Sequence, residues 1–173
     1  AKKKEIEPFK AKSPVERFEQ DGFFWHIRNR SLLQSLLLPG STGIIAEFKR
    51  KSPSKGWFKK KELEVEPVVV AYNKQAAGIS VLTDSEFFGG DLDDLIQTKV
   101  VTDIPVLRKD FIIDKWQIAE AKAFGADVIL LIAACLSPAQ IRDFAVYAKS
   151  IGLESILEVH NGEELGHCCD EVS

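Results

Sequence analysis

The sequence has little of what marks membrane, secreted or nucleic-acid-binding proteins. Its three cysteines include one adjacent pair and no CxxC spacing, so neither a zinc site nor a disulfide framework is indicated. No apolar run approaches the roughly 20 residues that span a bilayer, and the lysine-rich start lacks the apolar core of a secretory signal. The net charge of -3 disfavours general nucleic-acid binding. We therefore expect a cytoplasmic protein with no membrane, nucleic-acid or metal partner.

The composition that is present is ordinary for a globular protein. Hydrophobic residues make up 45% of the chain and charged residues 28%, which argues against disorder. A length of 173 residues lies within the range of one domain. The order of the residues is more informative than their proportions.

From Gly43 onward the chain repeats one pattern of an apolar run, a polar turn, a helical segment and a glycine. Short apolar runs rich in β-branched residues are typical of strands that are covered on both faces. Their starts lie roughly 22 to 35 residues apart, which is the size of a strand–helix unit. The expected strands are residues 44–49, 79–83, 106–111, 128–133 and 155–160.

The segments between these runs carry the signals of helix ends. Ser137, followed by Pro138 and Gln140, predicts a capping box with proline at the first helical position. Glycines, which adopt the left-handed conformation at low cost, are expected to end three helices. The other expected N-terminal caps are Asp114 and Asn161, and the expected terminating glycines are Gly78, Gly125 and Gly152.

Repeated strand–helix units predict an α/β fold with a parallel sheet and helices outside it. An open doubly wound sheet and a closed eight-stranded barrel both satisfy the pattern. The first strand is not followed by Gly-x-Gly-x-x-Gly, which weakens the dinucleotide-binding version of the open sheet.

The first 42 residues do not follow this pattern. Residues 2–12 are expected to begin a solvated helix. A group of apolar side chains is expected to cover one end of the sheet: Phe18, Phe23, Phe24, Trp25, Leu32, Leu33, Leu36, Leu37 and Leu38.

The informative anomaly is charge inside the expected strands. Glu47 and Lys49 have the same parity as Ile45 and therefore lie on its face. Lys109 and Glu158 take similar positions near the ends of the third and fifth strands. Charged side chains are rarely buried unpaired, and barrel active sites lie at the carboxyl ends of the strands. A structural role in ion pairs is the alternative, but four charges at matching depth favour a functional one.

Such a set of charges permits proton transfer. A lysine in a partly dry site beside another lysine can have its pKa lowered and can then protonate a developing oxyanion. A neighbouring carboxylate can accept a proton, and Schiff-base chemistry at a lysine is also open. The residues alone do not choose between these reactions.

The turn after the first strand, KSPSKG at residues 51–56, suits an anionic group such as phosphate. It offers hydroxyls, backbone N–H groups and positive charge. Lys59, Lys60 and Lys61 make the neighbourhood more basic, and we interpret them as a solvated charged loop.

Five segments carry a family resemblance: IIAEFKRKSPSKG from Ile44, ISVLTDSEFFGGDLDDL from Ile79, PVLRKDFIID from Pro105, GADVILLIAACLS from Gly125 and ILEVHNGEEL from Ile156. In this order they resemble the indole-3-glycerol phosphate synthase family of tryptophan biosynthesis. The resemblance runs from about Gly43 to the end, and its first segment is highly specific.

The resemblance implies a (βα)8 TIM barrel, of which this chain supplies about the first five βα units. We expect an N-terminal extension at residues 1–42 and a partial barrel at residues 43–173 that stops before a sixth strand. It also implies a carboxy-lyase that needs no cofactor. The implied reaction is ring closure, decarboxylation and dehydration of the phosphosugar 1-(2-carboxyphenylamino)-1-deoxyribulose 5-phosphate to indole-3-glycerol phosphate.

Site residues are implied position by position. Lys109 matches the family's general acid, and Glu158 matches a carboxylate that acts as acid or base in the dehydration. Glu47 and Lys49 match the charged pair of the first strand, and Ser52 matches a phosphate contact. The implied apolar walls around the anthranilate ring are Pro53, Phe88, Phe111, Leu130 and Ile132.

The family's polar residues of strands 6 to 8 do not occur in this sequence, so two other interpretations stay open. One is an inactive barrel fragment or interaction module, and the other is a different phosphosugar barrel such as phosphoribosylanthranilate isomerase. Association with, or fusion to, neighbouring enzymes of the pathway is a further possibility that the resemblance raises.

Overall fold

A five-stranded parallel sheet lies at the centre of the computed structural model, which describes residues 2–58 and 64–172. The strand order is β1-β4-β5-β6-β7, so each strand pairs with the next one that the sequence predicts. All five predicted strands are confirmed to within a few residues. Their bounds are β1 (Ile45–Phe48), β4 (Gly78–Leu82), β5 (Val106–Lys109), β6 (Val128–Ile132) and β7 (Glu154–Glu158).

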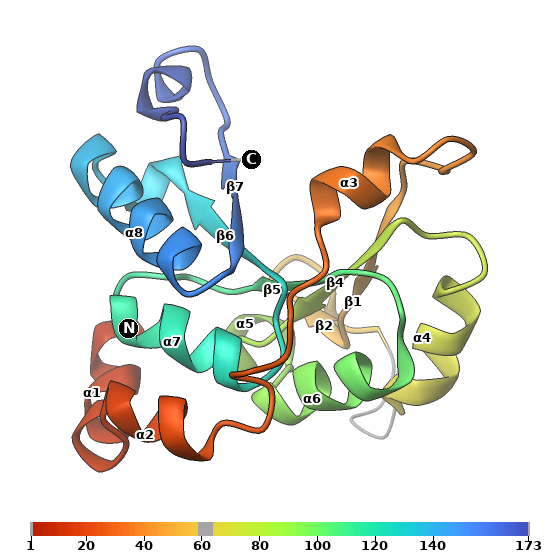
Figure 1. Ribbon diagram of the computed structural model, residues 1–173, viewed down its shortest axis with the longest axis horizontal. Coiled ribbons are helices and arrows are strands. Elements are labelled where there is room, and N and C mark those ends of the chain that lie inside the picture. Colours follow the sequence, from red (N-terminus) through yellow and green to blue (C-terminus); the bar gives the residue numbers. More distant parts are fainter. Residues whose placement is uncertain (1, 59–63, 173) are drawn as a thin grey trace.

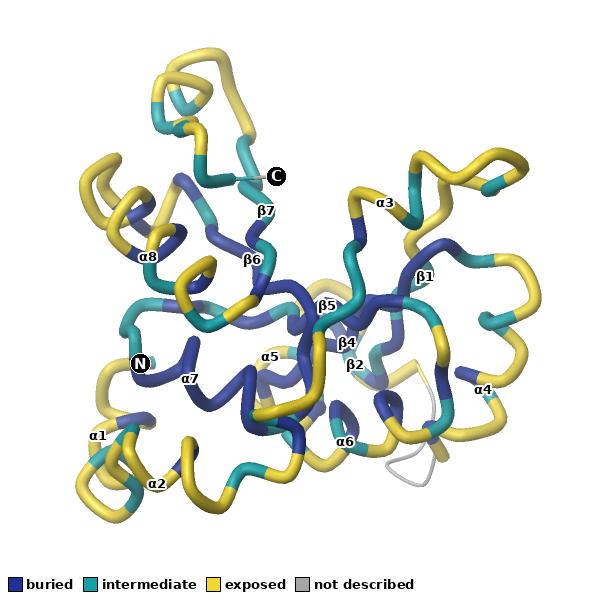
Figure 2. Tube along the Cα trace, viewed as in Figure 1, coloured by how far each residue is buried: buried dark blue, intermediate teal, exposed yellow. Residues whose placement is uncertain are grey.

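Helices cover the outer face of this sheet, as Figure 1 shows. Each long helix returns the chain to the start of the next strand, which is the connection that parallel pairing requires. A continuous apolar core lies between the two layers and includes Phe48, Ile79, Ile129 and Ile141. The helices are α4 (Val65–Tyr72), α6 (Leu92–Val101), α7 (Lys115–Ala123) and α8 (Pro138–Ser150), with a short α5 (Ser85–Phe88) before α6. Figure 2 shows β4, β5 and β6 as mostly buried, whereas β1 and β7 at the two edges of the sheet are mostly of intermediate exposure.

Most of the predicted helix ends are confirmed. Ser137 and Gln140 form the reciprocal capping box at the start of α8. Asp114 accepts a hydrogen bond from the Trp116 N–H at the start of α7, and Asn161 accepts one from the Glu164 N–H. That second cap begins only a short 3-10 helix, η2 (Glu164–His167), and another, η1 (Ala133–Cys135), follows β6.

The three glycines behave differently from one another. Gly125 and Gly152 adopt φ values of 97° and 83° at helix ends, as predicted. The prediction for Gly78 is wrong, because it opens β4 instead of ending a helix. A Cβ there would lie 2.5 Å from the end of the Leu32 side chain, so a larger residue would displace Leu32.

Three helices precede the first strand: α1 (Lys2–Lys12), α2 (Val15–Asp21) and α3 (Leu32–Leu37). The predicted helix at residues 2–12 is confirmed, but it is not wholly solvated, since Ile6 is buried. Ile6 and Phe18 pack with Trp116 against α7, and Figure 1 shows α1 and α2 beside that helix. The extension therefore covers the side of the helical layer.

The prediction that the apolar residues of this segment cover one end of the sheet is largely wrong. Leu32 does so, because it packs with Leu107, Val128 and Leu130 on the inner face, and Leu36 packs against the same cluster. Phe18 packs on α7 instead. Four others are exposed to solvent: Phe23, Leu33, Leu37 and Leu38.

The segment after β1 forms a small antiparallel hairpin of β2 (Lys51–Ser52) and β3 (Gly56–Trp57), where only a turn was expected. Gly56 has a φ of 65°, which suits the tight reversal. The basic segment of Lys59, Lys60 and Lys61 lies outside the described residues. Within the described ranges, no helix is long and apolar enough to cross a membrane.

Candidate active site

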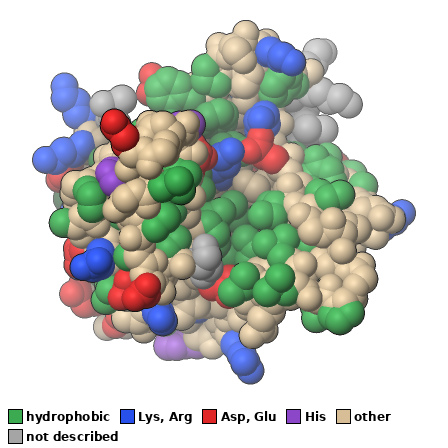
Figure 3. Space-filling model, turned by 90° about the horizontal axis from the view of Figure 1, so that it is seen from above, with side chains coloured by type: hydrophobic (Ala, Val, Ile, Leu, Met, Phe, Trp, Pro, Cys, Tyr) green, Lys and Arg blue, Asp and Glu red, His purple; other side chains and the backbone are tan. Residues whose placement is uncertain are grey.

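The carboxyl ends of the central strands bring together charges that are far apart in the sequence. In the sheet register Glu47 of β1 lies opposite Ser80 of β4, and Leu82 of β4 lies opposite Lys109 of β5. Residues paired across parallel strands point to the same face. Figure 3 shows basic and acidic side chains meeting at the edge of a hydrophobic hollow on this side of the molecule.

Glu47 is the centre of the charged cluster. One of its carboxylate oxygens accepts a hydrogen bond from Lys49, and the other lies 3.0 Å from the Lys109 Nζ. The three side chains are 28%, 32% and 34% exposed, respectively, so they are partly desolvated but still reachable. The predicted sharing of a face by Glu47 and Lys49 is confirmed, and Lys109 joins them across 62 residues of sequence.

Two opposing effects act on the Glu47 carboxyl. Burial raises its pKa, but the hydrogen bonds and positive charges of Lys49 and Lys109 outweigh burial and lower the pKa below its ordinary value. Glu47 is therefore an anion at neutral pH that holds two ammonium groups in place. Each lysine keeps protons that are free to point elsewhere.

Glu158, the last residue of β7, faces the same hollow. A cavity of about 340 Å³ is lined by Glu47, Ser80, Lys109 and Glu158 together with apolar side chains of the strands. Lys109 and Glu158 also line an adjoining cavity of about 150 Å³. Lys109 and Glu158, two groups capable of acid–base chemistry, therefore line both of these adjoining cavities. Glu158 also contacts His160, whose Nε2 lies 3.2 Å from the Glu158 Oε1.

The smaller cavity has an aromatic and aliphatic wall. Phe88 and Phe111 line it and stack on each other, with ring centroids 6.5 Å apart and planes 27° apart. Leu130 and Ile132 complete the wall from β6. The structure thus places four of the five predicted wall residues in one cavity beside Lys109.

Ser52 and Pro53 do not line either cavity. Ser52 is nearly buried, and its hydroxyl accepts a 3.3 Å hydrogen bond from the Lys55 N–H within the β2–β3 hairpin. Pro53 is exposed at the tip of this hairpin. Their roles at a phosphate and in the ring wall stay predictions.

The sequence reasoning overlooked Ser80 and Phe87. Ser80 lines the larger cavity, and its buried hydroxyl has no hydrogen-bond partner among the residues that the structure describes. Phe87 meets Phe111 edge to face at 5.9 Å. A serine within the apolar run GISVL was the available signal for Ser80, whereas Phe87 was visible only as one of two adjacent phenylalanines.

This arrangement combines a carboxylate-anchored lysine, a second carboxylate and a flat apolar wall. It can protonate an oxygen on a planar apolar substrate at one group and remove a proton from it at another. Within residues 2–58 and 64–172, no group of three or more His, Cys, Asp or Glu side chains is arranged to hold a metal ion.

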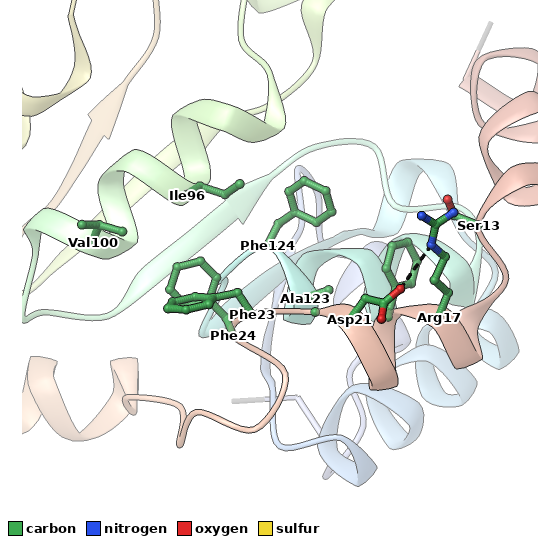
Figure 4. Close-up of a pocket in the computed structure, with 11 residues that line it drawn as sticks. Ser13, Arg17, Asp21, Phe23, Phe24, Ile96, Val100, Ala123 and Phe124 are labelled. Atoms are coloured by element: carbon green, nitrogen blue, oxygen red, sulfur yellow. Dashed lines mark ion pairs between the residues drawn. The ribbon is translucent and has the colours of Figure 1, made fainter.

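A larger apolar pocket of about 420 Å³ lies away from this chemistry. It is formed by α2, the following turn and the C-terminal parts of α6 and α7, with Phe23, Phe24, Val100 and Phe124 in its wall (Figure 4). Its charged lining residues are Arg17 and Asp21, an exposed ion pair. Because the helices run opposite to the strands, this pocket is near the amino ends of the strands, where barrels do not build active sites.

Comparison with known proteins assigns the chain to a family. The family model for indole-3-glycerol phosphate synthase matches residues 1–171. The chain belongs to this family. The family fold is the (βα)8 barrel, and the five-stranded parallel sheet with its outer helices is consistent with part of one.

Curated members of the family include close relatives. The chain is 50% identical over 138 residues to the indole-3-glycerol phosphate synthase of Desulfotalea psychrophila, which covers 78% of the chain and 52% of the relative. It is 45% identical over 141 residues to that of Bacteroides thetaiotaomicron, covering 81% of the chain and 54% of the relative. With the enzyme of Variovorax paradoxus, the identity is 39% over 171 residues, covering 95% of the chain and 64% of the relative. The chain thus spans about half to two thirds of the length of these relatives.

Proposed function

We propose that the protein acts as an indole-3-glycerol phosphate synthase. The reaction is ring closure of 1-(2-carboxyphenylamino)-1-deoxyribulose 5-phosphate, with loss of carbon dioxide and water, to give indole-3-glycerol phosphate. The observation that carries the proposal is the bridge from Lys49 through Glu47 to Lys109 beside a cavity that Glu158 and two stacked phenylalanines line.

Lys109 is the general acid of the proposal. Ring closure turns a ketone into an alkoxide, and a positioned ammonium group removes that charge as it forms. The 3.0 Å bond to Glu47 fixes the Nζ at the rim of both cavities and still leaves it protons to donate. Lys109 is one third exposed, so a bound substrate would complete its desolvation.

Glu158 and Lys49 take the remaining polar roles. Glu158 lines the same cavity as Glu47 and Lys109 and serves as the acid or base of the dehydration. Lys49, held by Glu47, neutralises the substrate carboxylate or shares in proton transfer. The ammonium groups of Lys49 and Lys109 supply the positive charge for an anionic substrate.

Binding orients a flexible substrate between two anchors. The anthranilate ring packs against Phe88, Phe111, Leu130 and Ile132, with Pro53 as the remaining wall residue. Ser52 contributes to holding the phosphate. Fixing both ends brings the aromatic carbon to the ketone carbon, which is worth several kcal/mol in such reactions.

The test is conversion of the substrate to the fluorescent indole product. We would assay the chain alone and together with the remaining barrel units of the Desulfotalea psychrophila relative, supplied as a separate polypeptide. Product formation that requires the chain is expected in at least one of the two. Its absence from both, or equal product from the relative's units alone, would contradict the proposal.

The same protein samples test the alternatives. When phosphoribosylanthranilate is the substrate, its consumption together with no indole formation in the first assay would favour the isomerase. Tight binding of the relative's units without any turnover would favour an interaction module.

The finer assignments are part of this proposal. We propose a cytoplasmic location because the family's reaction belongs to amino-acid biosynthesis. The division into an extension at residues 1–42 and a partial barrel at 43–173 stays a proposal. So does association with, or fusion to, other enzymes of the pathway.

A further inference from the structure

Lys2, at the start of α1, reaches deep into the end of the sheet. Its Nζ lies 2.9 Å from an Asp84 oxygen and 2.8 Å from an Asp110 oxygen. The lysine side chain is 11% exposed, and each of the two carboxylates is 2% exposed. A third contact, 2.9 Å to Glu5, closes the group within the same helix.

Asp84 and Asp110 each organise one of the loops at the proposed active site. Asp84 caps α5 and accepts a 2.7 Å hydrogen bond from the Phe87 N–H. Asp110 directly follows Lys109 and accepts a 2.7 Å hydrogen bond from the Phe111 N–H. The two aspartates therefore fix the backbones that carry the aromatic pair of Phe87 and Phe111.

Asp110 is also the centre of a buried network behind the sheet. It accepts hydrogen bonds from the Thr83 hydroxyl at 2.7 Å and from Arg108 at 3.1 Å, and Arg108 in turn pairs with Glu120. Burial raises the pKa of Asp110, but Arg108 and Lys2 outweigh it and lower the pKa below its ordinary value. Removal of Lys2 would leave the buried carboxylates of Asp84, Asp110 and Glu120 with the buried guanidinium of Arg108.

A second ion pair from the same helix offers a contrast. Lys10 pairs with Asp114 at 2.7 Å, but these side chains are 34% and 31% exposed. Pairs as exposed as this contribute little to stability, whereas a cation withdrawn from a buried network leaves uncompensated charge. Lys2 and Lys10 both connect α1 to the same region of the fold, but we expect the loss of Lys2 to affect the structure far more than the loss of Lys10.

We propose that Lys2 is a positioning residue, which joins Asp84 and Asp110 and so holds the α5 and β5–α7 loops, with Lys109 and the Phe87–Phe111 pair, in their catalytic arrangement. Lys2 does not line the cavities at Lys109, and its effect passes through the two aspartates. The proposal deepens the proposed function and rests on it for its kinetic consequence. Its structural consequence is independent of any activity.

Amide hydrogen exchange tests the structural consequence in this chain. In Lys2→Met the N–H groups of Phe87 and Phe111 should exchange at least about tenfold faster, while the helical amides of α8 keep their rates. Lys10→Met is the matched control and should leave both phenylalanine amides unchanged, and Lys2→Arg should restore most of the protection. Unchanged exchange at Phe87 and Phe111 in Lys2→Met would overturn the proposal.

A double variant separates positioning from simple charge balance. Lys2→Met combined with Asp84→Asn removes one charge of each sign, and asparagine still caps α5, so this variant should fold even if the single one does not. We expect kcat to stay on the order of tenfold to a hundredfold below wild type in the assay described above, with a smaller change in KM. Recovery of wild-type kcat and of Phe111 protection would overturn the proposal.

A wild-type protein without turnover would contradict the proposed function only, because the exchange experiment still decides the role of Lys2.

Discussion

The two ends of the sheet both carry charge, but they use it differently. At the amino end, Asp127 is fully buried and accepts hydrogen bonds from Lys99 at 2.6 Å, from the Arg30 N–H at 2.8 Å and from the Val106 N–H at 2.9 Å. At the carboxyl end, Glu47 and its two lysines are about one third exposed beside an open cavity.

The difference separates a structural from a chemical use of the same residue types. The bonds at Asp127 tie the N-terminal segment and α6 to β5, and burial leaves no path for a substrate. Burial lowers the pKa of Lys99, although Asp127 opposes this effect. The Glu47 cluster is held less tightly and is reachable, so its lysines can exchange partners when a ligand arrives. Partial exposure and spare protons, and not charge alone, mark the reactive end.

The largest expected effect is on turnover at the carboxyl end. Lys109→Ala should lower kcat by roughly a hundredfold to ten-thousandfold, the usual contribution of a general acid, with little change in KM. Because Lys109 is partly exposed, its loss should alter the free energy of unfolding only slightly. Steady-state kinetics and urea unfolding measure the two quantities. A kcat within about threefold of wild type would remove Lys109 from the mechanism.

The next largest effect is on stability at the amino end. Asp127→Ala leaves Lys99 buried without its carboxylate and should lower the free energy of unfolding by about 3 to 5 kcal/mol. The kcat of the remaining folded protein should be close to wild type. Urea unfolding followed by circular dichroism measures the loss. Lys115→Met, which removes an exposed ion pair with Asp143, is the control. A loss of stability in Asp127→Ala no larger than that in Lys115→Met would contradict the expected result.

A smaller effect is expected in the β2–β3 hairpin. Ser52→Ala should raise KM by roughly twofold to tenfold, the value of one hydrogen bond, and leave kcat unchanged. Ser150→Ala, an exposed position at the end of α8, is the control and should leave both constants as they are. Equal kinetics in the two variants would remove Ser52 from substrate binding.

The smallest effect is electrostatic and needs no substrate. Glu47 should titrate below the ordinary glutamate pKa of about 4.3. Because this pKa is lowered in the folded state, its stabilising contribution is present above the ordinary value and is lost as the pH falls through the lowered one. Carbon-13 NMR of the carboxyl measures the midpoint. Lys109→Met should raise the pKa of Glu47, and Lys115→Met should leave this pKa unchanged. An equal response to both substitutions would show that Lys109 does not lower the pKa of Glu47.

The reactive end could largely be predicted from the sequence because strand parity is a local rule. Glu47 and Lys49 share a face with Ile45 through a spacing of two, and the ordered strand–helix units place Lys109 two strands away. Leu130 and Ile132 were implied only by the family resemblance, and their spacing of two on β6 explains why they share a face. Periodicity and strand order were sufficient for the charged residues.

What could not be predicted depends on contacts between distant segments. Lys2 resembled the start of a solvated helix, since nothing local reveals aspartates 82 and 108 residues away. Gly78 carried the ordinary signal of a helix end, and only the folded structure shows its close approach to Leu32. Phe18 was assigned to the sheet end because an apolar residue does not reveal which surface it will cover.

The central claim is that substrate binds at the carboxyl end of the sheet and not at the amino end. The most direct measurement is NMR of the chain with biosynthetically carbon-13-labelled lysines, titrated with a substrate analogue whose ketone is reduced to an alcohol. The Lys49 and Lys109 signals should shift with one shared dissociation constant, while the signal of Lys99 should stay fixed. A shift at Lys99 with unmoved Lys49 and Lys109 would contradict the central claim.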